Sequence, residues 1–212
     1  MLRWSIVESP ITSHVPSADG VEVAVHDYGG SGRPLVLVHG TGLCSRMWEP
    51  VLEHLPPGAV RALAVDLRGH GSTRTPAEVT FTEDRMVADL GAVCRAFDLS
   101  GAWVAGHSMG GASSLLTAVA LPSAFERLWV YEPIIFPRPE DSTGPSAMIE
   151  ATRRRRPSFP SREAAIARYG SRPPLDELDP AALQAYVEHG FTDEPDGSVS
   201  LACKPQHEAR AF

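Results

Sequence analysis

The chain has 212 residues, of which 43% are apolar and 21% are charged, and this ordinary globular composition excludes disordered and fibrous proteins. Its formal net charge of −7 argues against a nucleic acid or an anionic membrane surface as the main partner. No apolar run approaches the roughly 20 residues that span a bilayer, and the first residues lack the pattern of a signal peptide.

The three cysteines are odd in number and lie far apart, so neither a disulfide framework nor a metal cluster is predicted. We therefore expect a cytoplasmic protein with no metal or other cofactor. Nucleic acid and membrane are not expected as partners, and the oligomeric state stays open.

Short apolar runs alternate with longer helix-like segments over residues 1–135, an order typical of a parallel sheet with crossover helices. Residues 21–25 alternate like a half-exposed strand. Continuous apolar runs at 35–38, 62–65, 103–105 and 128–131 predict strands that are covered on both faces. Helices are predicted over 45–55, 82–97 and 108–121. The fold class that follows is α/β, with a mostly parallel, doubly wound sheet.

From Pro133 onward, frequent prolines divide the chain into short pieces. Helices are predicted over 146–156, 161–169 and 180–189, and Asp196-Gly197 predicts a small hairpin turn before residues 199–201. Because no buried-strand run occurs here, residues 136–212 are predicted to form a helical layer over the core of residues 1–135. The run of four arginines at 153–156 is interpreted as a solvated helix end.

The most informative motif is the sequence GHSMGG at residues 106–111, which has the pattern G-x-S-x-G between a predicted strand and an alanine-rich helix. A sharp turn at this place holds Ser108 in strained backbone geometry, and the flanking glycines let neighbouring elements pass closely. The hydroxyl then projects beside a helix N-terminus, where backbone donors can stabilise an oxyanion. Ser108 is therefore the candidate nucleophile.

A glycine-rich turn, HGTG at residues 39–42, directly follows the strand predicted at 35–38. Such a turn at the carboxyl end of a parallel strand can aim backbone N–H groups into the crevice where ligands bind. The amide of Thr41 could thus join that of Met109 in an oxyanion hole. His39 is interpreted as a structural residue that hydrogen-bonds within the loop.

The sequence DLRGHGS at residues 66–72 follows another buried strand. We interpret its acidic and basic residues, Asp66 and Arg68, as fixing this loop by pairing with each other. His70, in the same loop, is also expected to be structural.

In this order, the three motifs resemble those of the α/β-hydrolase family, over about residues 20 to 135. The resemblance implies that Ser108 is the nucleophile and that the amides of Thr41 and Met109 are the oxyanion donors. It also implies that the proline-rich segment is a lid and that the substrate lies between core and lid. Candidate substrate-binding residues are then Gly40, Gly42, Trp48 and Phe136, although an aromatic residue of this kind is more often part of the core packing.

The family places its acid and its histidine after the serine, on loops that follow late strands. No later pair of buried strands and no late Gly-His turn is found, so the last strands and the usual histidine are expected to be absent from a chain truncated after the lid region. Glu132, 24 residues after Ser108, is a candidate acid that could equally anchor the lid. His189 and His207 follow the serine but read as surface residues, and the side chain of His107 should diverge from Ser108.

Three functions stay open. The first is a serine-dependent hydrolase of an ester, amide or similar bond in a small apolar molecule. The second is a non-catalytic, truncated or split homologue that binds a ligand or partner. The third keeps the fold but cleaves a carbon–carbon bond or performs perhydrolysis, and fold and motif alone do not separate it from the first.

Overall fold

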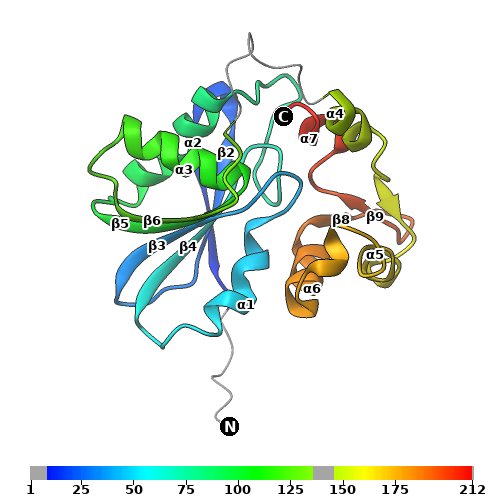
Figure 1. The fold of residues 1–212 in the computed structure, drawn as a ribbon, viewed down its shortest axis with the longest axis horizontal. Helices are drawn as coiled ribbons and strands as arrows, with labels where there is room; N and C mark the ends of the chain where they lie inside the picture. Colours follow the sequence, from blue (N-terminus) through cyan, green and yellow to red (C-terminus); the bar gives the residue numbers. More distant parts are fainter. Residues whose placement is uncertain (1–8, 136–145, 212) are drawn as a thin grey trace.

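The computed structural model describes residues 9–135 and 146–211, and its centre is a six-stranded sheet (Figure 1). In spatial order the strands are β1 (Ile11–Pro16), β2 (Glu22–Asp27), β4 (Val60–Asp66), β3 (Arg33–Val38), β5 (Ala102–His107) and β6 (Phe125–Tyr131). The last four of these are mutually parallel, whereas β1 and β2 run antiparallel to their neighbours. The prediction of a mostly parallel α/β sheet is confirmed. The prediction that residues 128–131 form a strand covered on both faces is wrong, because β6 is the last strand of the described sheet and Trp129 and Tyr131 are 58% and 53% exposed.

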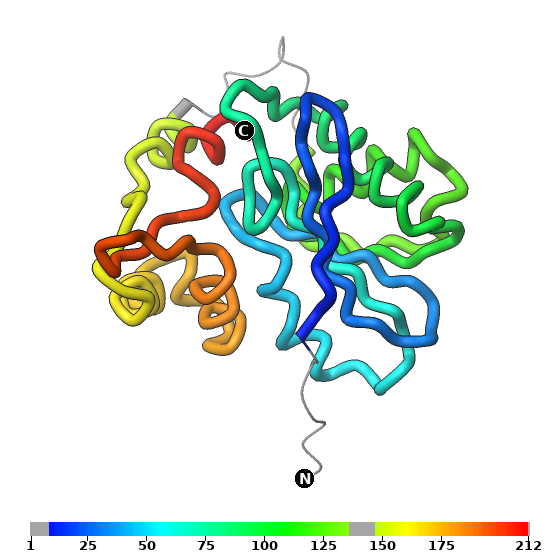
Figure 2. The backbone as a smooth tube through the Cα atoms, turned by 180° about the vertical axis from the view of Figure 1, so that it is seen from behind, coloured from blue at the N-terminus to red at the C-terminus, as the bar shows by residue number. Residues whose placement is uncertain are grey.

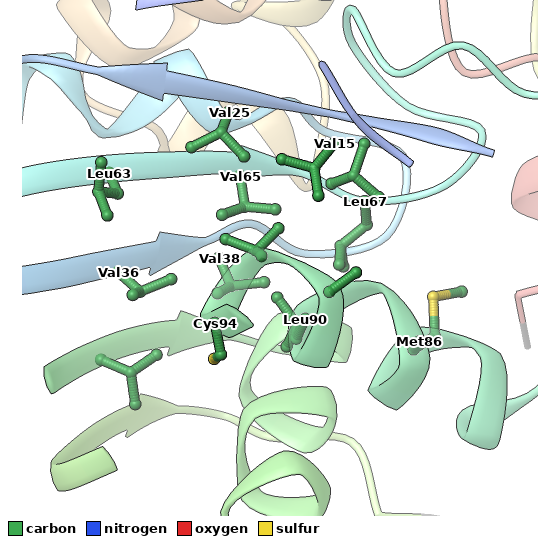
Figure 3. Close-up of a cluster of buried hydrophobic side chains, with 14 of the residues drawn as sticks. Val15, Val25, Val36, Val38, Leu63, Val65, Leu67, Met86, Leu90 and Cys94 are labelled. Atoms are coloured by element: carbon green, nitrogen blue, oxygen red, sulfur yellow. The ribbon is translucent and has the colours of Figure 1, made fainter. Parts of the chain in front are cut away.

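Helical segments cover both faces of the sheet. On one face, α2 (Glu83–Ala96) and α3 (Met109–Ala120) pack over the main hydrophobic core, where Figure 3 shows Val36 and Val38 of β3 facing Leu90 of α2. On the other face, η2 (Ser45–Trp48) and α1 (Glu49–Leu52) cover Leu37. Because successive side chains of a strand point to opposite faces, the continuous apolar run of β3 supplies both cores.

Two predictions for the N-terminal strands need correction. No strand was predicted at β1, whose polar sequence ITSHVP is mostly exposed at the edge of the sheet. The strand at 21–25 is not half-exposed, since β2 lies inside the sheet and is buried on both sides. On the face opposite Val23 and Val25, Ala24 and His26 are also buried, and His26 contacts Asp66 there.

The C-terminal layer, residues 146–211, contains the predicted helices and, in addition, short strands that were not predicted apart from the hairpin. Its elements are α4 (Ser146–Arg153), β7 (Ser158–Phe159), α5 (Arg162–Tyr169), η4 (Leu175–Glu177), α6 (Pro180–His189), β8 (Phe191–Asp193), β9 (Val199–Leu201) and α7 (Pro205–Glu208). The strands form an antiparallel sheet in the order β7-β9-β8. They have only two or three residues each, too few to give a visible alternation. The hairpin predicted at 196–197 is confirmed by the pairing of β8 with β9.

The C-terminal layer lies to one side of the sheet, with α2 and α3 away from it (Figures 1 and 2). Leu43 and Cys44, from the segment after β3, belong to the same hydrophobic cluster as the interior of this layer. Helix α6 also packs against η2. The loop that follows β3 is therefore one place where the two parts of the molecule meet. Among the described residues, no helix has the length and apolar character needed to cross a membrane.

Candidate active site

Ser108 lies between β5 and α3 with φ 53° and ψ −119°, a backbone conformation that residues other than glycine rarely adopt. Its amide donates to the Tyr131 carbonyl at 2.9 Å, and its carbonyl accepts from the Ala112 amide at 3.0 Å. The strained turn is thus held by the end of β6 on one side and by the first turn of α3 on the other. The side chain is partly exposed, as a nucleophile requires.

The glycines around Ser108 are required by close backbone contacts. A Cβ atom at Gly106 would lie 2.8 Å from the Gly110 carbonyl oxygen, and one at Gly110 would lie 2.5 Å from the His39 carbonyl oxygen. Any side chain here would push β5, α3 and the end of β3 apart. The glycines therefore bring the segment after β3 close to Ser108.

Residues 40–43, called the 40–43 turn below, form a tight turn beside this serine. The Leu43 amide donates to the Gly40 carbonyl at 3.2 Å, and Gly42 has φ 76°, which favours glycine at the third position of such a turn. A Cβ atom at Gly40 would lie 3.1 Å from Cβ of Ser108 and 2.7 Å from Nδ1 of His107. The turn therefore borders the serine directly, as the sequence predicted.

The two predicted oxyanion donors differ from their neighbours in hydrogen bonding. The Gly42 amide donates to Nε2 of His70 at 2.9 Å. Over residues 9–135 and 146–211, by contrast, neither the Thr41 nor the Met109 amide donates to a backbone carbonyl. Met109 is the first residue of α3, where the helix has no internal acceptor for its N–H.

Two buried histidines support the 40–43 turn as neutral rings. Nε2 of His39 accepts from the Leu67 amide at 3.1 Å, so Nδ1 donates to the Gly40 carbonyl at 2.8 Å. Nε2 of His70 likewise accepts from Gly42, so its Nδ1 donates to the Arg68 carbonyl at 2.8 Å. Burial lowers the pKa of both rings, that of His70 to about 3. Both residues have the structural role that the sequence predicted.

The expected pairing of Asp66 with Arg68 is wrong. Asp66 accepts from the Ser45 amide at 2.7 Å and contacts Nε2 of His26 at 3.0 Å. Arg68 instead points to α2, where its guanidinium pairs with Asp89 at 2.7 Å and 2.8 Å. Strand β4 ends at Asp66, so Arg68 lies in the loop beyond it, and each of the two side chains finds its partner on a different distant segment.

The interpretation of residues 153–156 as a solvated helix end is wrong for Arg155. Its Nη1 lies 2.7 Å from Glu208 and its Nη2 lies 2.6 Å from the hydroxyl of Tyr186, within the C-terminal layer. The Tyr186 hydroxyl in turn donates to the Gly42 carbonyl at 2.9 Å. Sequence reasoning missed this cluster because a run of arginines carries no sign of which member is buried.

Glu132 follows β6 as an exposed residue with φ 44°. The residues that directly follow the neighbouring strands β5 and β6, Ser108 and Glu132, thus both have positive φ. Burial lowers the pKa of His107, and the charge of Glu132 opposes that shift. Whether Glu132 is a catalytic acid or a lid anchor stays a prediction.

The remaining predicted substrate-binding residues have different surroundings. A Cβ atom at Gly42 would lie 2.4 Å from Glu208, so this residue faces the C-terminal layer. Trp48 packs edge-on against Trp129, with ring centroids 6.4 Å apart, and joins the core cluster around Leu37. Phe136 lies outside the described residues.

The histidines after the serine lie against other groups. His189 is 3.9 Å from Glu49, and the ring of His207 packs on Phe81 at 5.3 Å. In the part of the chain that the structure describes, no histidine is hydrogen-bonded to the Ser108 hydroxyl, and no group of three residues could hold a metal ion.

The chain is similar to known proteins both in sequence and in structure. The profile of the "Alpha/beta hydrolase family" matches residues 35–209. The chain is 36% identical over 102 residues to AB hydrolase superfamily protein YisY of Bacillus subtilis, covering 48% of this chain and 37% of that protein. It is 35% identical over 114 residues to 2-hydroxy-6-oxo-2,4-heptadienoate hydrolase of Pseudomonas putida, covering 52% of this chain and 41% of the relative.

The solved structure of E-2-(acetamidomethylene)succinate hydrolase superposes with a TM-score of 0.75 at 22% identity, covering 95% of this chain and 73% of the other. At that identity the likeness concerns the fold alone. The chain spans less than half the length of the two curated relatives.

Proposed function

Since this chain belongs to the alpha/beta hydrolase family, we propose that it provides the nucleophile and the oxyanion donors of a serine-dependent hydrolase. The substrate is an ester, amide or similar bond of a small, largely apolar molecule. Ser108 attacks the carbonyl carbon, and the amides of Thr41 and Met109 stabilise the negative charge that develops on the carbonyl oxygen. The C-terminal layer serves as the lid over the substrate.

One observation carries this proposal. Ser108 has φ 53° at the junction of β5 and α3, directly beside the 40–43 turn. Holding a serine in this backbone conformation costs about 1–3 kcal/mol of conformational free energy, and residues strained in this way cluster at functional sites. Within the described residues, neither the Thr41 nor the Met109 amide donates to a backbone carbonyl, and this adds to the proposal because oxyanion stabilisation needs donors that are not already engaged.

The reaction also needs a base for the serine proton. In a serine triad a histidine takes this proton and a carboxylate orients the histidine. Glu132 is our candidate for the carboxylate, since it follows the strand that packs beside Ser108. The histidine is the unassigned member of the triad.

The proposal is tested by labelling with a fluorophosphonate probe, which reacts with activated serines. We expect Ser108 to be labelled, and Ser108→Ala to abolish the labelling. Ser113→Ala is the matched control, because Ser113 lies buried on α3 and should leave the labelling unchanged. A folded chain that is not labelled, or is labelled elsewhere, would favour a non-catalytic protein that binds a ligand or partner.

A second candidate function is hydrolysis of a carbon–carbon bond, favoured by the likeness to 2-hydroxy-6-oxo-2,4-heptadienoate hydrolase. The same serine and oxyanion donors would serve that reaction. Turnover of p-nitrophenyl butyrate and of 2-hydroxy-6-oxo-2,4-heptadienoate, compared by kcat/KM in wild type and Ser108→Ala, separates the two functions. Preference for the ester supports the first, and preference for the dienoate supports the second.

A further inference from the structure

The peptide groups of Gly42 are held from two sides. From the core, Nε2 of His70 accepts the Gly42 amide at 2.9 Å. From the C-terminal layer, the Tyr186 hydroxyl donates to the Gly42 carbonyl at 2.9 Å, and Nη1 of Arg155 lies 3.5 Å from the same oxygen. Residues that are 113 and 144 positions away in sequence thus meet on one backbone carbonyl.

The contact from the C-terminal layer belongs to a buried polar cluster. Arg155 forms an ion pair with Glu208 at 2.7 Å, and its Nη2 donates to the hydroxyls of Tyr186 at 2.6 Å and Tyr169 at 3.2 Å. Tyr186 is 1% exposed, and the side chains of Arg155 and Glu208 are 19% and 10% exposed. In such a network each group orients the next, so the Tyr186 hydroxyl has one acceptor left for its proton, the Gly42 carbonyl.

The charges in the cluster favour a hydrogen bond in which the Tyr186 hydroxyl is the donor and the Gly42 carbonyl is the acceptor. Burial alone would lower the pKa of Arg155, but the neighbouring tyrosines and Glu208 outweigh it, and the pKa is raised. Burial also raises the pKa of Tyr186, so its hydroxyl keeps the proton that it donates.

The 40–43 turn has further supports within the core. The Gly40 carbonyl accepts from the Leu43 amide and from Nδ1 of His39. The Gly40 carbonyl belongs to the same peptide group as the Thr41 amide, and the contacts to Gly42 fix the two peptide groups that follow, while none of these described hydrogen bonds uses the Thr41 amide. The direction of the Thr41 N–H is therefore set by its neighbours.

We propose that Arg155 and Tyr186 are positioning residues that hold the 40–43 turn so that the Thr41 amide points at the oxyanion. This inference rests on the proposed function, because it assigns the C-terminal layer a part in oxyanion stabilisation. None of the described hydrogen bonds of Arg155 and Tyr186 goes to Ser108, whereas both side chains reach Gly42, so both act through Gly42. A layer that only covered the substrate would need no contact with this carbonyl.

The test compares Tyr186→Phe with Tyr169→Phe. Each variant removes a hydroxyl that accepts a hydrogen bond from the guanidinium of Arg155, but only Tyr186→Phe also removes the hydroxyl that donates to the Gly42 carbonyl. Amide hydrogen exchange of the segment 38–47 and kcat and KM for p-nitrophenyl butyrate are measured for both. Arg155→Lys, which keeps the charge beside Glu208 but loses the planar fork, is a second variant in case Tyr186→Phe does not fold.

We expect Tyr186→Phe to speed exchange of the Gly42 amide by about tenfold or more, because the turn opens more easily. We also expect it to lower kcat by about tenfold with KM unchanged, since the oxyanion forms only in the transition state. Tyr169→Phe should change each quantity by less than about twofold, and Arg155→Lys should act in the same direction as Tyr186→Phe.

Three outcomes would overturn the inference. In the first, Tyr186→Phe leaves the exchange rate of the Gly42 amide unchanged. In the second, Tyr186→Phe speeds this exchange but leaves kcat unchanged. In the third, Tyr186→Phe and Tyr169→Phe change exchange and kcat by the same amounts. If the wild type neither turns over esters nor reacts with the fluorophosphonate probe, the proposed function fails separately. The exchange comparison then still decides whether Arg155 and Tyr186 hold the turn.

Discussion

The ion pair between Arg68 and Asp89 joins the loop after β4 to helix α2. Nε and Nη2 of Arg68 lie 2.7 Å and 2.8 Å from the two carboxylate oxygens of Asp89, and both side chains are 0% exposed. The same loop carries His70, which accepts from the Gly42 amide. The substitution Asp89→Asn keeps the shape of the side chain but leaves a buried guanidinium without its main counter-charge.

The magnitude follows from burial. Breaking a buried ion pair by removing one partner costs about 3–5 kcal/mol in free energy of unfolding. Arg68 keeps a contact with Asp19 at 3.0 Å and a hydrogen bond to the Thr80 carbonyl at 2.7 Å. We therefore expect the lower end of that range, about 3 kcal/mol, which corresponds to a fall in Tm of about 6–12 °C for a chain of this size.

The assay is urea unfolding of wild type and variant, followed by circular dichroism. Glu22→Gln is the matched control, because Glu22 pairs with Arg74 at 2.7 Å while their side chains are 43% and 66% exposed. An exposed pair of this kind contributes less than about 1 kcal/mol. If Asp89→Asn destabilises the protein no more than Glu22→Gln, the reasoning from burial is refuted.

Three further predictions concern the candidate site. Gly42→Ala should destabilise the chain by about 1–3 kcal/mol more than Gly197→Ala in urea unfolding, because both glycines have positive φ but only a Cβ at Gly42 meets neighbours; equal effects would contradict this. Because the native pKa of His70 is about 3, below its ordinary 6.5, the unfolded chain protonates first and stability is lost as the pH falls from 6.5 toward 3. His70→Gln should reduce that slope of stability against pH by up to about 1.4 kcal/mol per unit, and an unchanged slope would refute the assignment. Glu132→Gln should slow fluorophosphonate labelling of Ser108 at least about 100-fold if Glu132 orients the base, and unchanged labelling would exclude that role.

Local features of the molecule could be predicted because they depend on residues that are close in sequence. The glycines around Ser108 predicted a tight turn between strand and helix, and Ser108 has the strained φ of 53° expected there. Continuous apolar runs predicted β3, β4 and β5, since strands covered on both faces need apolar residues at every position. The HGTG sequence likewise predicted a turn beside the serine.

Long-range partners were decided only by the tertiary structure. Nothing near Arg155 in sequence indicates that Glu208, 53 residues later, and the Gly42 carbonyl, 113 residues earlier, are its partners. Asp66 and Arg68 are two residues apart, yet they pair with His26 and Asp89 on different elements. A charged side chain is buried only where folding supplies a counter-charge and hydrogen bonds, and that supply depends on which distant segments come together. The sequence by itself therefore determined the strand–turn–helix that carries Ser108, whereas the packing of the C-terminal layer decided what holds the turn beside it.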